Sequence, residues 1–260
     1  MDAGGLIRFD ASQPWYAAVA QLRTSVVAPD PRTELSRRAA ELGVTTASGH
    51  PVEFVSEDDA PAGRAYETHI AATGRVPTRL NAHDLFNALV WLAMPRTKAR
   101  LNALQAMAIG REGIGARRGP LRDAATVFDE NGALLVTEDP VLPELLRRRR
   151  WRDAFVERRA AWTEVRVLCF GHALMEKFAT PYKAITAHAL VIARPPQSSL
   201  PAVDVAASTL IDAAFTTATL LPLPLLGVPG WCGENADPAF YDDGAVFRSN
   251  VGTPAGRPRG

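Results

Sequence analysis

The sequence predicts an α+β fold in which a mostly helical core packs on a small, mainly antiparallel sheet. Two observations carry this prediction. Apolar residues recur at helical spacing on both sides of Pro95, which predicts a bent pair of helices. Asn131-Gly132 separates two short apolar segments, which predicts a β-hairpin at residues 125–136. A chain of 260 residues can bury one large core, so we expect a single globular domain at 1–252 and a disordered tail at 253–260.

Four elements are predicted before the helix pair. Ser12 before a proline is typical of a helix start, and an Asp-Pro pair begins a second helix at 30–42, which a glycine ends. Residues 52–55 form a short apolar strand. Residues 66–70 alternate in polarity well enough to be predicted as another strand.

The helix pair carries the most informative polar residues. Asn81 precedes an apolar run and Asp84 follows three residues later, which is the pattern of a helix N-cap with an acidic partner. Pro95 ends the first helix, and a second helix is predicted from there to about Met107. Each helix carries one polar row, formed by His83, Asn87 and Trp91 on the first and by Lys98, Asn102 and Gln105 on the second. Facing rows of this kind form either a hydrogen-bonded seam or the walls of a pocket.

The rest of the chain follows from the same patterns. Glycine and arginine content predicts a loop at 110–119, where Arg111, Arg117 and Arg118 can face an anion. After the hairpin we expect a long helix at 140–162, a strand or buried helical segment at 165–170, a helix at 171–178 and a buried helix at 203–221.

Composition narrows the class of protein. The chain has 29 basic and 28 acidic residues, so no net field favours nucleic acid. The uncharged stretch at 213–228 is short and contains two prolines, so no membrane span is expected. Neither cysteine has a metal-type neighbour, and the first residues lack the pattern of a signal peptide. These features predict a reduced, cytoplasmic protein.

Several segments resemble the bacterial family known as domain of unknown function 3025. They are Asn81-x-His83-Asp84-x-Phe86-Asn87-x3-Trp91, Pro95-x2-Lys98-x2-Leu101-Asn102-x2-Gln105, Arg122-Asp123-x2-Thr126-x-Phe128-Asp129-Glu130-x-Gly132, Phe170-Gly171-His172-Ala-Leu-x-Glu176-Lys177 and Leu226-Gly-Val-Pro229-Gly230-Trp231. These segments span most of the chain. The resemblance implies no activity and no catalytic residue that can be carried over.

The candidate active site therefore comes from the residues themselves. We expect His83, Asp84 and Asp123 to be catalytic, with the Asp123 carboxylate orienting the His83 imidazole for proton transfer near neutral pH. We expect Asn87, Lys98, Asn102 and Arg122 to bind the substrate, which would be small and anionic, for example phosphorylated. The structural alternative is that Asp84 caps its helix and His83 lies in the seam.

A metal site is the second candidate. His172 and Glu176 are four residues apart and share a helix face, which suits two ligands of one divalent ion, with His83, His188 or Asp123 as a third. One such pair arises often by chance, and a helix-stabilising hydrogen bond explains it equally. A divalent metal is therefore compatible with the predicted site and is not required by it.

Two functions remain open from the sequence. The first is a cytosolic enzyme that acts on a small anionic molecule by His/Asp acid–base chemistry, with or without a metal. The second is a non-catalytic ligand-binding or scaffold protein in which the same polar residues lock the helix pair in place. A solvent-connected pocket lined from separate segments favours the first, and mutually satisfied hydrogen bonds favour the second.

Overall fold

A computed structural model describes the chain except residues 1–6, 8–9, 60–62, 64, 114–118 and 250–260. Helices predominate, and the α+β class is confirmed. The helices are α1 (Arg23–Val26), α2 (Pro31–Glu41), α3 (Tyr66–Thr73), α4 (Ala82–Ala93), α5 (Pro95–Glu112), α6 (Pro120–Asn131), α7 (Val141–Arg147), α8 (His172–Lys177) and α9 (Leu200–Leu210). The strands are β1 (Glu53–Val55), β2 (Arg75–Pro77), β3 (Gly132–Val136), β4 (Arg166–Cys169), β5 (Thr186–Ile192) and β6 (Leu221–Pro224).

The strands form two sheets. In the larger sheet the order is β4-β3-β5-β6, with β3 antiparallel to β4 and parallel to β5, and β5 antiparallel to β6. The smaller sheet pairs β1 with β2 in parallel, which requires a crossover connection, and α3 lies in that connection. The larger sheet is therefore mixed. Its central strand β3 is buried along its whole length, which agrees with its uninterrupted apolar sequence.

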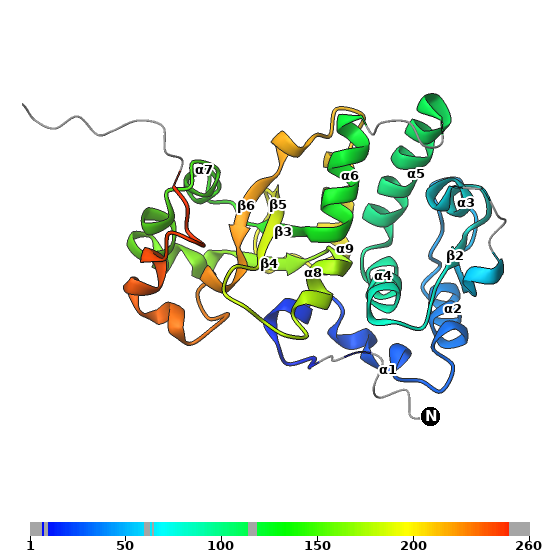
Figure 1. Cartoon of the computed structure of the whole chain (residues 1–260), viewed down its shortest axis with the longest axis horizontal. Coiled ribbons are helices and arrows are strands. Elements are labelled where there is room, and N and C mark those ends of the chain that lie inside the picture. Colours follow the sequence, from blue (N-terminus) through cyan, green and yellow to red (C-terminus); the bar gives the residue numbers. More distant parts are fainter. Residues whose placement is uncertain (1–6, 8–9, 60–62, 64, 114–118, 250–260) are drawn as a thin grey trace, which may run out of the picture.

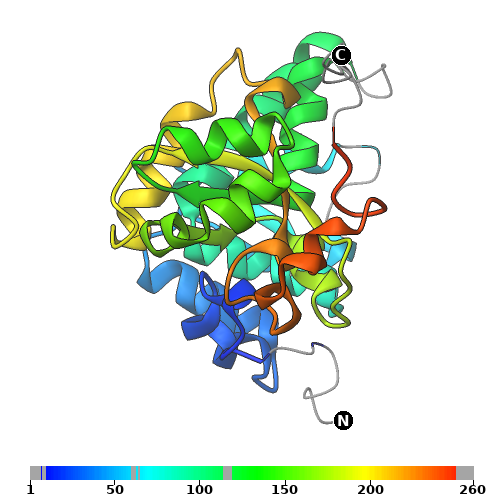
Figure 2. The same cartoon turned by 90° about the vertical axis from the view of Figure 1, so that its left-hand side faces the viewer.

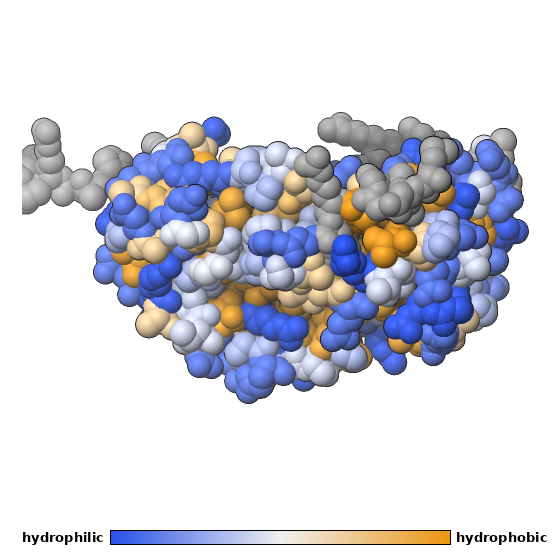
Figure 3. Space-filling view, turned by 90° about the horizontal axis from the view of Figure 1, so that it is seen from below, coloured by the Kyte–Doolittle hydropathy of each residue, from blue (hydrophilic) through white to orange (hydrophobic). Residues whose placement is uncertain are grey.

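Helices α2 to α6 lie to one side of the larger sheet in Figure 1, and α7 with the described residues that follow β6 lies to the other. Figure 2 brings α7 to the front, with the N-terminal segment below it. Buried apolar residues from Ile7 to Phe247 join one core cluster across these layers. The face seen from below in Figure 3 alternates small polar and apolar patches. In the described part of the chain, no helix is both long enough and apolar enough to cross a membrane.

The predicted hairpin at 125–136 is wrong. Residues 120–131 form helix α6, because Ala124, Ala125 and Phe128 recur at helical spacing and are buried. Gly132 has φ −76° and ψ 150°, so it begins strand β3 directly and makes no primed turn. The Asn-Gly dipeptide marks the end of a helix, and the partners of β3 come from distant parts of the chain.

Other predicted elements differ in type or length. The segment at 66–70 is helix α3 and not a strand. The helix expected at 140–162 is interrupted, because α7 ends at Arg147 and Arg149 adopts a positive φ of 57°. Helical turns of other types resume at Asp153–Glu157 and Arg159–Glu164. The helix expected at 203–221 is α9, which ends at Leu210, and the last residue of the expected range, Leu221, begins β6. The segment at 165–170 resolves as strand β4.

Several predictions are confirmed. Asp30 caps α2 by accepting from the Thr33 N–H, and residues 53–55 form β1. The bent helix pair is α4 and α5, and Pro95 is the first residue of the second helix. Ser12 is not a cap, since Gln13 precedes the short 3₁₀ turn Pro14–Tyr16. The loop predicted at 110–119 is wrong at its start, because residues 110–112 continue helix α5. Residues 114–118, which include Arg117 and Arg118, and the tail at 253–260 lie outside the described residues.

Candidate functional site

The ends of three helices meet at one place. The N-terminus of α4 brings His83, the C-terminus of α6 brings Asp129 and Glu130, and the N-terminus of α8 brings His172. Helix α4 starts where predicted, because the Asn81 side chain accepts a hydrogen bond from the Asp84 N–H at 2.8 Å. The site therefore draws on segments almost 90 residues apart in the sequence.

Two aromatic stacks set the relative positions of these helices. Phe128 of α6 stacks on Phe170 before α8 at 4.9 Å between ring centroids, directly next to the site residues on both segments. Tyr16 stacks on Phe86 of α4 at 5.5 Å, and its hydroxyl donates to the main-chain oxygen of Met175 in α8. Buried aromatic contacts of this kind contribute about 0.5–1.5 kcal/mol each beyond the area they bury. Packing in the core therefore holds the three helix ends close together.

Gly171 allows the closest of these approaches. A Cβ atom on Gly171 would lie 2.4 Å from the main-chain oxygen of Glu130, so any other residue would push α8 away from α6. The Gly171 N–H instead donates to the Gly132 oxygen at 2.8 Å. His172 follows directly and is thereby held beside the end of α6.

A half-open cavity of about 390 Å³ lies over these helix ends. Its wall is drawn from the loop after β1, from α3, from β2 and the loop after it, and from α4, α6 and α8. The residues that line it are Glu57, Tyr66, Glu67, His69, Pro77, Arg79, His83, Asp84, Asn87, Asp129, Glu130 and His172. Five of these twelve are carboxylates and one is an arginine, so the bare cavity favours a cation over an anion.

His83, Glu130 and His172, which we call the triad, point three ligand atoms at one another. The Nε2 atoms of His83 and His172 lie 3.0 Å apart, and Glu130 Oε2 lies 3.5 Å from the second and 4.0 Å from the first. The point equidistant from these three atoms is about 2.1 Å from each, which is the bond length of Zn²⁺ to imidazole nitrogen and carboxylate oxygen. Two histidines and one carboxylate are also a ligand set that catalytic metal sites use, with one position left open.

The outer nitrogens of the two imidazoles support a cation between them. His83 Nδ1 lies 3.1 Å from Glu176 Oε2, which favours a proton on Nδ1 and a lone pair on Nε2. His172 Nδ1 is buried, has no hydrogen-bond partner among the described residues, and lies 3.8 Å from Asp129 Oδ2. A hydrogen bond between the Nε2 atoms would leave one Nδ1 lone pair facing a carboxylate. A cation at Nε2 removes that conflict, because both Nδ1 atoms can then be protonated.

The protonation states suit ligation. Burial, only partly offset by Asp129, lowers the pKa of His172 to about 4, so its imidazole is neutral near pH 7, as a ligand must be. Burial also raises the pKa of Glu130 above its ordinary value. A cation beside Glu130 would reverse that shift, because an opposite charge favours the ionised carboxylate.

Behind the triad lies a satisfied polar network. Lys98 Nζ donates to Asp129 Oδ1 at 2.6 Å and to Asn87 Oδ1 at 2.7 Å, and Asn87 Nδ2 donates to the Tyr66 hydroxyl at 3.1 Å. Burial raises the pKa of Asp129, but the charge and hydrogen bond of Lys98 together with the neighbouring His172 and His83 outweigh this and hold it below its ordinary value. The predicted seam between α4 and α5 therefore exists here, and it positions the triad from behind.

The predicted site residues divide into three groups. His83, Asp84 and Asn87 line the cavity, while Lys98 and Asn102 lie behind its wall in bonds to other residues. Asp84 accepts from Arg79 Nε and Nη2 at 3.0 and 3.1 Å and from the Arg79 main-chain N–H, so it anchors a loop. Asp123 and Arg122 lie on the first turn of α6, at the end away from Glu130, and are not among the lining residues.

The expected pairing of His83 with Asp123 is therefore wrong, and Glu176 takes that place. His172 and Glu176, which were predicted to ligate one metal, do lie at the same site. Only His172 belongs to the triad, because Glu176 contacts the outer nitrogen of His83. The third histidine considered, His188, lies on β5 and is not part of the triad.

Sequence analysis missed Glu130, Glu67 and Arg79 as site residues. Glu130 was assigned to a turn because of the predicted hairpin. Read as a helix, residues 120–131 place Glu130 and Asp129 in the last turn beside Gly132, which is the signal that could have identified them.

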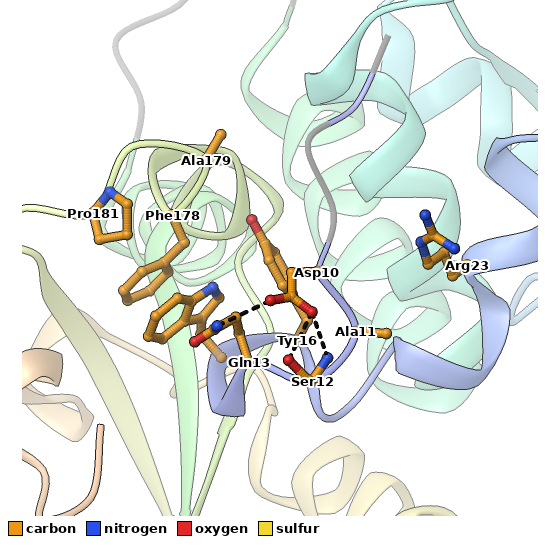
Figure 4. A pocket seen from close by; sticks show the side chains of 10 residues that line it. Asp10, Ala11, Ser12, Gln13, Tyr16, Arg23, Phe178, Ala179 and Pro181 are labelled. Atoms are coloured by element: carbon orange, nitrogen blue, oxygen red, sulfur yellow. Dashed lines mark hydrogen bonds between the residues drawn. The ribbon is translucent and has the colours of Figure 1, made fainter. Parts of the chain in front are cut away.

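A second cavity lies between the N-terminal segment and α8 (Figure 4). Its polar groups bond to one another, since Asp10 accepts from Ser12 and Gln13, and the rings of Trp15 and Phe178 stack at 4.6 Å. No candidate metal cluster among the described residues lies there. We therefore assign the functional site to the triad cavity.

Comparison with known families gives one match. Residues 52–250 match the family described as Protein of unknown function (DUF3025), and the match covers more than half of the chain. The chain therefore belongs to this family, as its motifs indicated. Comparison with curated proteins and with solved structures found no match.

Proposed function

We propose that this member of the DUF3025 family is a metal-dependent hydrolase that acts on a small anionic substrate. His83, His172 and Glu130 would hold one divalent ion of the Zn²⁺ class at the floor of the cavity. The observation that carries the proposal is the convergence of three ligand atoms on a point about 2.1 Å from each. Such an ion lowers the pKa of a bound water and polarises the substrate oxygen that it contacts.

The residues around the triad have separate tasks in this proposal. Glu176 orients the His83 ring, because a carboxylate on the outer nitrogen of a metal-bound histidine fixes its tautomer and direction. Arg79 is the basic residue of the cavity wall. Asp84 occupies its Nε–H and one Nη2–H, which leaves the remaining guanidinium donors for an anionic group of the substrate.

Because the cavity is negatively charged, the binding of an anionic substrate depends on the metal ion. Without it, the carboxylates on the wall outnumber the basic groups and repel an anion. With it, Glu130 is neutralised and the open coordination position accepts a substrate oxygen. A small anion should therefore bind to the metal-loaded protein and not to the stripped protein.

The scaffold alternative is supported by one observation, the satisfied network of Asn87, Lys98 and Asp129. That network lies behind the cavity wall, whereas the triad faces solvent on one side, with 35% of the His83 side chain exposed. The network accounts for the folding of the site, but it gives no structural reason for the convergence of the three triad side chains.

A cytoplasmic location agrees with the two cysteines, which are both unpaired.

The test uses the full chain. The protein is stripped with a chelator and reloaded with Zn²⁺ or Mn²⁺, and its melting temperature is measured with and without inorganic phosphate, acetate and a panel of anionic esters and amides. The proposal predicts about one tightly bound ion per chain, a rise in melting temperature with anions only after loading, and turnover of one substrate class. A protein that binds no ion and gains no stability from any anion would be a scaffold.

A further inference from the structure

Glu67 is a carboxylate that is fixed in the cavity wall and that forms no ion pair with a cationic side chain among the described residues. It lies in the first turn of α3 and is mostly buried. The amide nitrogen of Asn102 on α5 donates to Glu67 Oε2 at 2.7 Å and to the main-chain oxygen of Glu67 at 2.9 Å. One bond therefore holds the carboxylate and the other its main chain, and the neutral Asn102 side chain adds no positive charge.

The other carboxylates of the cavity are committed to partners. Glu130 belongs to the triad, and the remaining ones contact cationic side chains. These pairs are Asp84 with Arg79 at 3.0 Å, Asp129 with Lys98 at 2.6 Å, and the exposed Glu57 with Arg79 at 3.8 Å. Among the described lining residues, Glu67 is thus the carboxylate best placed to exchange a proton with a molecule in the cavity.

We propose that Glu67 is the proton-transfer residue of this cavity. The inference rests on the proposed hydrolytic function. In the first step an O–H bond of the attacking water breaks and its proton passes to a Glu67 carboxylate oxygen. The water oxygen forms a bond to the electrophilic carbon or phosphorus of the substrate, and the electron pair of the double bond from that atom to oxygen moves onto the oxygen. In the second step this electron pair re-forms the double bond, the bond to the leaving group breaks, and the leaving group takes the proton from Glu67. Water is the one co-reactant, and no oxidant or reductant is required.

The electrostatic surroundings of Glu67 fit this role. Burial, reinforced by the negative charge of Asp129, raises the pKa of Glu67 from 4.5 to about 7. Lys98 and the Asn102 amide offset part of this rise. A group that exchanges a proton in both directions works best when its pKa lies near the working pH. Asp129 on α6 and Lys98 on α5 are the charged groups that face Glu67, and they bond to each other.

The experiment measures the proton on Glu67 directly. Infrared difference spectra of the full chain are recorded across a pH titration for the wild type, Glu67→Gln and Glu57→Gln, each with and without Zn²⁺. We expect a protonated-carboxyl band in the wild type that titrates near pH 7, is missing in Glu67→Gln and persists in Glu57→Gln. Because a nearby cation favours the ionised carboxylate, Zn²⁺ should lower the midpoint by about one pH unit.

The outcomes separate this inference from the proposed function. If Zn²⁺ binds to the wild type but the Glu67 band is absent near neutral pH, or ignores the ion, Glu67 is not the proton-transfer residue and the metal site stands. If Zn²⁺ binds to neither the wild type nor the variants, the proposed function fails, and the Glu67 assignment fails with it. A Glu67→Gln protein that binds Zn²⁺ and turns over at the wild-type rate overturns this inference alone.

Discussion

The Nε2 atoms of His83 and His172 lie 3.0 Å apart, and the outer nitrogen of each ring faces a carboxylate. Two neutral imidazoles cannot make favourable contacts at all of these nitrogens. If one Nε2 atom carries the proton between the rings, the Nδ1 atom of the same ring has no proton, and its lone pair faces a carboxylate. A divalent ion between the rings satisfies both.

Replacement of His172 by Ala should abolish metal binding. The ring supplies one of three ligand atoms, and the remaining two, on His83 and Glu130, lie 4.0 Å apart. Equilibrium dialysis with Zn²⁺ should show about one ion per chain in the wild type and none in the variant. His50→Ala, on an exposed turn, is the matched histidine control and should bind as the wild type does. Full zinc binding by the His172 variant would remove this residue from the site.

Glu176→Gln should weaken metal binding without abolishing it. The glutamine oxygen can still accept from His83 Nδ1, but it no longer makes the imidazole more basic. Outer carboxylates of this kind change metal affinity by about 10- to 100-fold. Calorimetric titration with Zn²⁺ should give a dissociation constant raised by that factor. An unchanged constant would mean that Glu176 only stabilises α8.

Gly171→Ala should damage both stability and the site. Its Cβ would lie 2.4 Å from the Glu130 oxygen, so α8 must move away from α6. Overpacking of this type costs about 1–3 kcal/mol in the free energy of unfolding. Zinc affinity should fall as well, because His172 moves with α8.

Gly110→Ala is the control for this substitution. Gly110 lies on α5 with open space around the added atom, so alanine there should stabilise the helix by about 0.5–1 kcal/mol. Urea denaturation and zinc titration of both variants check the pair. Equal behaviour of the two variants would contradict the close approach at Gly171.

Glu67 should make stability depend on pH in a defined direction. Its pKa is about 7 in the folded protein and 4.5 in its ordinary state, so between these values the folded protein holds a proton that the unfolded chain has lost. The contribution to the free energy of unfolding is therefore fully present below about pH 4.5 and is lost as the pH rises to about 7, by at most about 3 kcal/mol. Because the lowered pKa of His172 makes stability rise with pH in the same range, the effect of Glu67 is read as a difference between two proteins. Urea denaturation of metal-free protein should show the wild type losing stability relative to Glu67→Gln as the pH rises from about 4.5 to about 7. Identical slopes would count against a raised pKa.

Local signals were sufficient for part of the fold and of the site. The N-cap at Asn81, the break at Pro95 and the start of α2 depend on neighbouring residues alone, and the structure has them where the sequence predicts them. His83 and His172 were both identified as candidates because histidines beside carboxylates stand out in any helix pattern.

Long-range pairing accounts for most of what was missed. Strand β3 pairs with β4 and β5, which lie about 30 and 50 residues further along the chain. The local pattern around Asn131-Gly132 therefore contains no information about the strands that pair with β3. The choice of Asp123 as the partner of His83 followed from that error. In a helix with 1.5 Å rise per residue, Asp123 is about 10 Å from Glu130 along the axis. The carboxylates that face the two histidines are at the other end of α6 and, for the outer nitrogen of His83, on α8.

X-ray absorption at the zinc edge tests the central claim most directly, because it reports the ligands of the ion itself. The full chain loaded with one equivalent of Zn²⁺ should show two imidazole rings and at least one oxygen at about 2.0–2.1 Å, with one imidazole lost in His83→Ala. An ion coordinated only by oxygen, or by sulfur from Cys169 or Cys232, would contradict a site shared by His83 and His172.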